Sequence, residues 1–349
     1  MVLKSNLTYP KCIQAICLLK TQLNGKQLKI NYKSRIFLLI GFISSANGMP
    51  AMDWVQKMSE SMRNLNYRGN FVYMHEKQLE SMSILHLKNE QGEKERLLSL
   101  NGEAREVIRD NKNLTCIWPS SRTVVIDHTK QNSFSPLFIP DDIASISQLY
   151  DVKLTGKDRV AGHESVMVFI SPKDQLRYGI KLWIAEESAL LVKSNLINEL
   201  GEVIEQVMFT SLEVLLDSHD LTLNTIPELD ESFTMVRYHQ GEPSEESSSD
   251  VAWHLTDMPK GFRLDSVLKR EVSATGLYVH QMIFTDGLAS LSVFVEKESV
   301  QNHSGSTSMG AVNAFIRIVD GHSIIAIGEV PAATVQQVAE SVFYQEPNL

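Results

Sequence analysis

The chain is poor in cysteine and has no long hydrophobic run. Only three of its 349 residues are cysteines. No apolar stretch approaches the roughly 20 residues that a membrane-spanning helix needs, so we expect no polytopic membrane protein. Glycine and proline, at 18 and 11 residues, are too scarce for a collagen-like or low-complexity chain. The length therefore predicts a globular protein of about two domains.

Acidic residues are absent from the first 48 positions. This segment carries seven Lys or Arg residues, and the remaining 301 residues carry 26 basic and 42 acidic side chains. The main body of the protein is therefore strongly acidic, with a formal charge of −16. Nucleic-acid phosphates and anionic lipid headgroups would repel such a body, because binding them needs clustered Lys and Arg. The charge therefore disfavours nucleic-acid binding.

Residues 1–48 have the pattern of a secretory signal peptide with an unusually long N-terminal extension. Lys33 and Arg35 precede the apolar run 36–43, and small residues follow it up to Gly48. The run is too short to cross a bilayer as an anchor. We therefore expect export across the inner membrane and cleavage near Gly48. A start codon assigned too far upstream would explain the extension.

Residues 49–216 are predicted to form the first domain, one large antiparallel sheet with one or two helices. Apolar residues at helical spacing predict a helix over 51–65. Six short strand-like runs separated by polar turns follow from Gly69, a pattern typical of an antiparallel meander. A short helix over 141–149 then precedes five further strands, which end at residue 215.

Residues 217–250 are predicted to be a flexible linker, and residues 251–349 a smaller α+β domain. The stretch 240–250 is acidic, rich in serine and without apolar residues, which is typical of a flexible segment. Five strand-like runs and a terminal helix over 335–343 follow it. Asp-Gly pairs at 286–287 and 320–321 predict tight hairpin turns, and we expect residues 299–309 to form a mobile loop.

No catalytic motif is present. The sequence contains no Gly-x-Ser-x-Gly, His-Glu-x-x-His, Walker or Gly-x-Gly-x-x-Gly pattern, and its ten histidines are scattered. Cys116 is the only cysteine after residue 48 and lies in the apolar run 114–118. We expect it to be buried and inert, without an internal disulfide in the mature chain. The sequence therefore predicts no enzyme, no metal site and no cofactor.

Bulky apolar residues occupy both faces of the predicted strands between 71 and 126. Val72 and Met74 alternate with Phe71 and Tyr73, whereas a sheet with one solvated face would show a cleaner alternation. Two interpretations remain open. Both faces are covered by ordinary core, or one face forms a concave apolar surface that could hold a lipid acyl chain.

Seven segments after residue 48 resemble the MucB/RseB family. They occur in the family's order, five of them resembling its amino-terminal domain and two its carboxy-terminal domain, whereas the linker and the segment 299–309 carry no family motif. The segments are 65–73 (LNYRGNFVY), 97–102 (LLSLNG), 105–109 (REVIR), 158–163 (DRVAGH), 177–183 (RYGIKLW), 284–296 (FTDGLASLSVFVE) and 328–331 (GEVP).

The resemblance implies a periplasmic negative regulator of the envelope stress response. Members of the family bind the periplasmic domain of a membrane-spanning anti-sigma factor and protect it from regulated proteolysis. Their larger domain is similar to LolA/LolB-type carriers, a half-open β-barrel around an apolar cavity. Mislocalised lipid or lipopolysaccharide is expected to enter that cavity and to release the anti-sigma factor. A periplasmic lipid or lipoprotein carrier without a regulatory role is the alternative, and a homo-oligomer remains open.

The resemblance and the strand pattern together nominate two sets of residues. The alternative for each is an ordinary role in the core or in a hairpin turn. We expect seven large side chains to line or gate the lipid cavity: Phe71, Tyr73, Met82, Ile84, Leu98, Trp118 and Phe138. We expect six residues of the second domain to bind the partner: Phe284, Asp286, Gly287, Leu288, Leu291 and Val293.

Overall fold

The computed structural model describes residues 49–75, 78–111, 113–128, 143–216, 232–237, 244–245, 252–272, 277–297 and 304–345. The predicted signal peptide, Phe138 and most of the predicted linker lie outside these residues. The described part contains three sheets, two α-helices and one 3-10 helix. None of its helices is long and apolar enough to cross a membrane.

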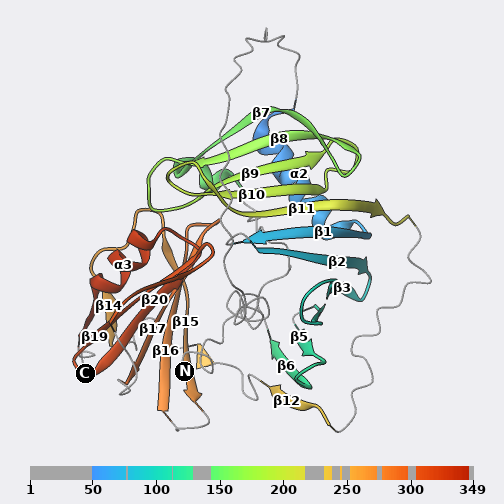
Figure 1. Ribbon diagram of the computed structural model, residues 1–349. Helices are drawn as coiled ribbons and strands as arrows, with labels where there is room; N and C mark the ends of the chain where they lie inside the picture. The colour runs from blue at the N-terminus through green and yellow to red at the C-terminus, as the bar shows by residue number, and fades with distance from the viewer. Residues whose placement is uncertain are drawn as a thin grey trace.

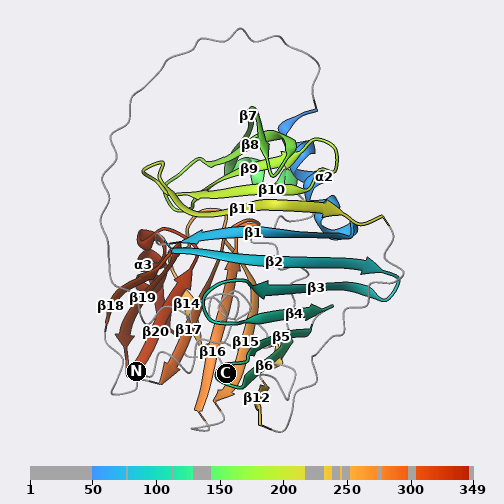
Figure 2. The same cartoon turned by 45° about the vertical axis from the view of Figure 1, so that its right-hand side comes forward.

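Twelve strands of the first domain form one open sheet. They are β1 (Tyr67–His75), β2 (Gln78–Asn89), β3 (Gly92–Ser99), β4 (Glu106–Asp110), β5 (Asn113–Trp118), β6 (Thr123–His128), β7 (Tyr150–Val160), β8 (His163–Pro172), β9 (Gly179–Ala185), β10 (Leu191–Ile197), β11 (Val203–Val214) and β12 (Thr234–Arg237). Their order is β12-β6-β5-β4-β3-β2-β1-β11-β10-β9-β8-β7, so β7 and β12 are the free edges. Every neighbouring pair is antiparallel except β12 and β6, and the sheet bends on its way from β7 to β12 (Figures 1 and 2).

Helix α2 (Ala51–Asn64) covers part of one face of this sheet. Its Val55 and Met58 are buried, and the helix packs on β7, β8 and the 3-10 helix η1 (Ile143–Gln148). An apolar stripe at helical spacing makes such a helix stable only when that stripe is buried against a partner. The helix therefore forms one layer and β7–β10 the other layer of the core at this end of the domain.

The second domain is a seven-stranded sheet covered on one face by a helix (Figure 1). Its elements are β13 (Ser244–Glu245), β15 (Arg263–Val272), β16 (Leu277–Thr285), β17 (Ser290–Lys297), β18 (Gly305–Met309), β19 (Val312–Val319), β20 (His322–Gly328) and α3 (Ala332–Ser341). The strand order is β13-β15-β16-β17-β20-β19-β18, and β14 (Trp253–Leu255) pairs separately with β21 (Val342–Tyr344). Val335, Val338 and Ala339 of α3 pack on the central strands.

The predicted α+β class and the large open antiparallel sheet are confirmed, as are both α-helices and the six-stranded meander. The turn at 320–321 has positive φ at both residues, as a two-residue hairpin requires. The loop prediction was wrong for residues 305–309, because they form the edge strand β18. Strand β12 was not anticipated, because its pairing partner β6 lies about a hundred residues away in the sequence.

Cys116 is completely buried, as expected. Its sulfur is nevertheless disulfide-bonded, which we did not expect. Burial in an apolar cluster thus follows from the local sequence, whereas the pairing of the sulfur does not.

Candidate functional site

A cluster of nine buried apolar side chains lies on one face of β1–β5 and β11. We call it the Phe71 cluster, and its members are Phe71, Met82, Leu97, Val107, Leu114, Cys116, Trp118, Val207 and Phe209. Phe71 lies directly opposite Met82 on one neighbouring strand and Phe209 on the other. Side chains at directly opposite positions share a face of the sheet. The face continues through Val207, opposite Ser194, to the strands that α2 covers.

Five of the seven predicted lipid-lining residues meet in this cluster. Phe71, Met82 and Trp118 are buried members, and Tyr73 and Ile84 are partly buried and pack against them. Leu98 is 37% exposed and points away, because its neighbour Leu97 belongs to the cluster and successive strand residues alternate between faces. Phe138 lies outside the described residues. The structure therefore brings together one coherent set and separates Leu98 from it.

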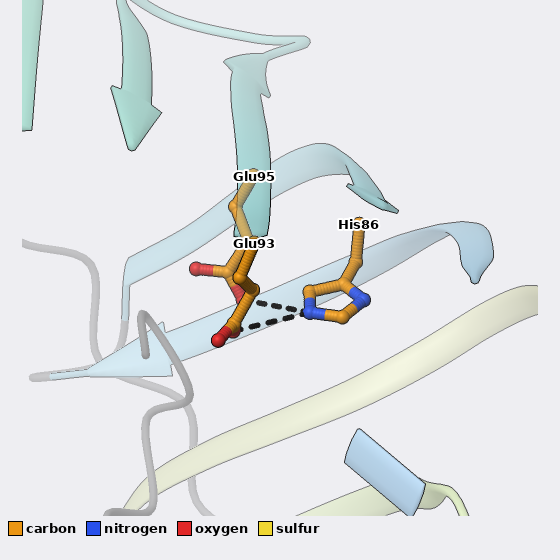
Figure 3. Close-up of side chains that lie close together, drawn as sticks. All are labelled: His86, Glu93 and Glu95. Carbon is orange, nitrogen blue, oxygen red and sulfur yellow. Dashed lines mark hydrogen bonds and ion pairs between the residues drawn. The ribbon is translucent and has the colours of Figure 1, made fainter. Parts of the chain in front are cut away.

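Charged side chains flank the Phe71 cluster along the same face. Tyr67, His86, Glu95 and Arg109 form one row across β1–β4. Glu93 lies two residues from Glu95 on β3, and both carboxylates lie close to the ring of His86 (Figure 3). All five side chains are buried. At the other end of the cluster, a second ionic group joins Arg105, Glu80 and His75, with 2.7 Å between Arg105 Nη2 and Glu80 Oε2.

Hydrogen bonds connect the members of the row. His86 Nδ1 donates to the carbonyl oxygen of Leu65 (2.8 Å), and His86 Nε2 forms a hydrogen bond with Glu93 Oε1 (3.2 Å). Arg109 donates to both Glu93 and Glu95. Burial acts to raise the pKa of Glu93, but the bond from His86 and the charge of Arg109 outweigh it and hold that pKa below its ordinary value.

His86, Glu93 and Glu95 also have the donor set of a divalent metal site. Their ligand atoms lie within 4.8 Å of one another. Arg109, however, already supplies a positive charge to both carboxylates, with Nε 2.9 Å from Glu95 Oε2. A metal ion would have to displace this guanidinium from a buried position. We therefore interpret the row as an ionic cluster in which Arg109 takes the place of a metal cation.

The sequence analysis above did not nominate this cluster. The sequence nevertheless contains the signal. Glu93 and Glu95 are two residues apart in β3 and lie on the same face as Leu97, while the residues between them lie on the other face. Charges at alternate positions next to apolar residues indicate an inward-facing ionic group. The partners on neighbouring strands could be identified only once the register was known.

A third ionic group, which is fully buried, joins the two domains. Arg177, just before β9, places Nη1 2.8 Å from Asp286 Oδ2 in the turn between β16 and β17, and neither side chain is exposed. Tyr150 also donates to Asp286 Oδ2 (2.8 Å). Arg177 Nη2 donates to the carbonyl oxygen of Lys260, and its guanidinium lies over the ring of Phe262. The network satisfies the donors and acceptors that it buries, so it holds the domains in a defined orientation.

The six predicted partner-binding residues fall into two places. Asp286, Gly287 and Leu288 lie at the contact between domains, where Leu288 packs into the core beneath α2. Phe284, Leu291 and Val293 are buried in the core of the second domain under α3. All six are buried. They therefore contribute to the contact between the two domains and to the core of the second domain.

The opposite face of the second sheet carries an apolar surface that sequence analysis did not nominate. We call it the Phe294 face; its members are Leu268, Val279, Ile283, Phe294, Ile325 and Ile327. Phe294 alternates with Val293 and Val295 of the α3-side core, so it points to the other side of the sheet. The signal was again in the sequence, because β16, β17 and β20 carry apolar residues at consecutive positions, which is typical of a sheet apolar on both faces.

Comparisons with known proteins agree with this two-domain arrangement. The model of the MucB/RseB N-terminal domain matches residues 50–228, and that of the MucB/RseB C-terminal domain matches residues 247–343. The chain belongs to the MucB/RseB family. The predicted resemblance is thereby confirmed.

Relatives in this family align over most of the chain. The Sigma factor AlgU regulatory protein MucB of Pseudomonas aeruginosa is 29% identical and the Sigma-E factor regulatory protein RseB of Haemophilus influenzae 26% identical, each alignment covering 88% of this chain and 96% of the relative. A crystal structure of MucB in complex with MucA(peri) superposes with a TM-score of 0.64 at 25% identity, covering 85% of this chain and 99% of that one. MucB alone gives 0.58 at 27% identity, with coverages of 84% and 98%.

Proposed function

We propose that this chain is a periplasmic regulator of an envelope-stress sigma factor and that it binds the periplasmic domain of a membrane-spanning anti-sigma factor. One observation carries the proposal. Both family domains are present in order, and nearly the whole length of a MucB chain crystallised with MucA(peri) superposes on this chain. The relatives are named as regulatory proteins, and the proposed function requires binding without catalysis.

In this proposal the Phe294 face is the partner surface of the second domain. Four of its six members, Val279, Ile283, Ile325 and Ile327, are only partly buried, so apolar area remains available to a partner helix or strand. The six residues nominated from the sequence support this surface indirectly. Phe284, Leu291 and Val293 support the sheet from its other face, and residues 286–288 hold it against the first domain.

Protection from proteolysis tests this function. The purified periplasmic domain of the cognate anti-sigma factor is digested with its regulated protease, with and without the full chain. We expect the chain to slow cleavage, and Ile283→Asp to weaken binding at least about tenfold, since it places a charge in an apolar contact. Tyr344→Asp is the matched control, because Tyr344 is an exposed apolar residue outside the face. Unchanged cleavage in the presence of the wild-type chain would overturn the proposal.

We further propose that the Phe71 cluster accepts an acyl chain of lipid or lipopolysaccharide and that this binding releases the anti-sigma factor. Its partly buried members Tyr73 and Ile84 provide the point of entry. Such a ligand can shift the equilibrium only by its difference in affinity for the two states, typically about 1–3 kcal/mol. Wild-type chain should bind a fluorescent fatty acid and lose anti-sigma binding in its presence.

Two substitutions on neighbouring strands separate this site from a general effect on the sheet. Ile84→Asp puts a charge into the cluster, whereas Leu98→Asp puts the same charge on the opposite face. We expect only Ile84→Asp to abolish fatty-acid binding and release. Equal effects of both would contradict the site. Fatty-acid binding without any protection of the anti-sigma factor would instead favour the carrier function.

Export and processing complete the proposal. The charge pattern of residues 1–48 and the apolar run 36–43 support cleavage near Gly48. The protein recovered from a periplasmic fraction should have an intact mass that corresponds to a chain beginning at Met49. A mass that retains residues before Lys33 would contradict cleavage at this site.

A further inference from the structure

The first sheet has an outer face, on the side opposite to α2, that has no part in the proposed function. Ile180, Leu182 and Ile184 of β9 pack beneath α2, so the residues that alternate with them point to the outer face. The register extends this face over β8, β9, β10 and β11, which lie side by side (Figure 1). We call it the Trp183 face, and its members are Met167, Phe169, Lys181, Trp183, Lys193, Asn195, Gln206 and Met208.

Two lysines lie against the indole ring of Trp183. Lys193 Nζ is 4.4 Å and Lys181 Nζ 5.2 Å from the ring centroid. Neither ammonium group forms a salt bridge or a hydrogen bond with a residue that the structure describes. The ring attracts both cations, so it holds two like charges close together. The face therefore presents a preformed pair of positive charges without an anion.

The acidic groups around the Trp183 face do not neutralise this pair. None of its members is acidic. Asp158 of β7 attracts both lysines, but its carboxylate already accepts the indole N–H of Trp183 (2.9 Å) and the backbone N–H of Arg159 (2.8 Å). One carboxylate beside two ammonium groups leaves an excess of positive charge. Since the chain as a whole has a net charge of −9, this face is a local exception.

Asn195 supplies a second and independent sign of a ligand. It lies directly opposite Lys181 on one neighbouring strand and opposite Gln206 on the other. The residue is only 8% exposed, and its Oδ1 has no hydrogen-bond partner in the described part of the chain. A buried acceptor without a donor costs free energy, so a ligand N–H that reaches this oxygen would bind favourably.

We propose that the Trp183 face binds an acidic segment of a partner protein. Carboxylates of the segment pair with Lys181 and Lys193, and one of its backbone N–H groups donates to Asn195 Oδ1. A polypeptide offers carboxylates and N–H donors in one chain, whereas the carboxylate of a fatty acid brings no donor. Met167 and Met208 are partly buried and can adapt to apolar side chains beside the acidic ones.

The inference does not rest on the proposed function. The Phe71 cluster lies on the other face of the sheet, and the Phe294 face belongs to the second domain. The acidic remainder of the chain repels an acidic segment, so binding is confined to the one face that carries the unpaired lysines.

Fluorescence anisotropy with the full chain tests the binding. The probe is a labelled octapeptide of alternating Glu-Glu and Leu-Leu pairs, so that both sides of the extended peptide carry acidic and apolar side chains. We expect saturable binding that weakens at least about tenfold between low salt and about 0.5 M salt. The same peptide with Gln in place of Glu should bind at least about tenfold more weakly. Equal binding of both peptides, or no binding of the acidic one, would overturn the proposal.

Matched lysine variants locate the binding. Replacing Lys181 and Lys193 together by glutamine should weaken peptide binding at least about tenfold. Replacing Lys153 and Lys157 of β7 by glutamine removes the same charge, but these lysines are exposed and already paired with carboxylates. This control should bind the peptide within about twofold of wild type. Equal losses in both double variants would overturn the proposal, because net charge alone would then explain the binding.

Asn195→Leu separates a binding role from a structural one. Leucine removes the unpaired acceptor at similar volume, so the unfolding midpoint should not fall. Peptide binding should weaken at least about threefold, because one hydrogen bond is lost. A lower midpoint with unchanged peptide binding would overturn the proposal. Binding of phosphatidylglycerol vesicles through Lys181 and Lys193, without binding of the peptide, would overturn it too and would identify a lipid surface.

Discussion

The ionic row of the first sheet and Glu205, which contacts the second domain from β11, hold carboxyl groups in opposite electrostatic settings. Glu93 lies between Arg109 and His86, and its pKa is held below the ordinary value. Burial and then the charge of Glu329 raise the pKa of Glu205 to about 7. Glu93 is buried and Glu205 partly buried, so burial alone does not decide the direction. The balance of neighbouring charge does.

The difference separates two kinds of contact in one molecule. Arg177 and Asp286 belong with the ionic row, because each charge there has a buried partner. Such pairs lose much when one member is removed and respond little near neutral pH. At a second contact between the domains, Glu205 accepts a hydrogen bond from the backbone N–H of Ala311 at 3.1 Å, and Glu205 is only partly buried. The two domains are thus joined by a fully buried ion pair at one place and by a partly buried hydrogen bond at the other.

Removing Arg177 should have the largest effect, because it breaks the fully buried ion pair between the domains. Arg177→Met leaves Asp286 buried without its cation, and we expect the free energy of unfolding to fall by about 3–5 kcal/mol. Denaturant unfolding followed by circular dichroism measures the loss. Arg159→Met is the control, because Arg159 and Glu164 form a pair with 69% and 71% of their side chains exposed. Similar losses in both variants would contradict the argument from burial.

Removing Arg109 tests the charge balance of the ionic row. Arg109→Met should lower the free energy of unfolding by about 3 kcal/mol, towards the lower end for buried pairs because His86 still donates to Glu93. It also uncovers the donor set of His86, Glu93 and Glu95. We expect added Zn²⁺ to raise the unfolding midpoint of the variant and not that of the wild type. If Zn²⁺ changed the unfolding midpoint of the variant no more than that of the wild type, Arg109 would not occupy the position of a cation.

Sequence periodicity predicted the elements better than it predicted their partners. The apolar stripe of residues 51–65 and the Asp-Gly turns are local signals, so α2 and the hairpins could be placed from the sequence. Strand β12 and the Arg177–Asp286 pair depend on contacts between residues about a hundred positions apart, which local patterns do not encode.

The candidate site shows the same limit. Phe71, Tyr73, Met82 and Ile84 were placed together correctly because period two in adjacent strands fixes which residues share a face. Leu98 was placed with them because it is as apolar as Leu97, and only the register of β3 shows which of the two points inward. The same ambiguity directed attention to Val293 and away from Phe294.

Removing the charge of Glu93 should give a moderate, pH-dependent effect. Its folded-state pKa lies below the ordinary 4.5, so its stabilising contribution is present above that pH and is lost as the pH falls through the folded-state pKa. Glu93→Gln should therefore cost about 1–2 kcal/mol at pH 7, and the difference from wild type should shrink in acid. Unfolding free energies measured from pH 7 to pH 3 check this. A difference between Glu93→Gln and wild type that grows in acid would mean that the pKa of Glu93 is not lowered in the folded protein.

The smallest effect is expected for an Arg–carboxylate pair that is exposed to solvent. Arg68 Nε lies 2.8 Å from Glu213 Oε2, as close as Arg177 lies to Asp286, but about 60% of each side chain is exposed. Arg68→Ala should change the free energy of unfolding by about 0.5 kcal/mol or less, and 0.5 M salt should remove even that difference. Denaturant unfolding at low and high salt measures both. The two ion pairs have the same separation and differ only in burial. A loss comparable to that of Arg177→Met would therefore mean that separation, and not burial away from water, determines how much the Arg177–Asp286 pair stabilises the protein.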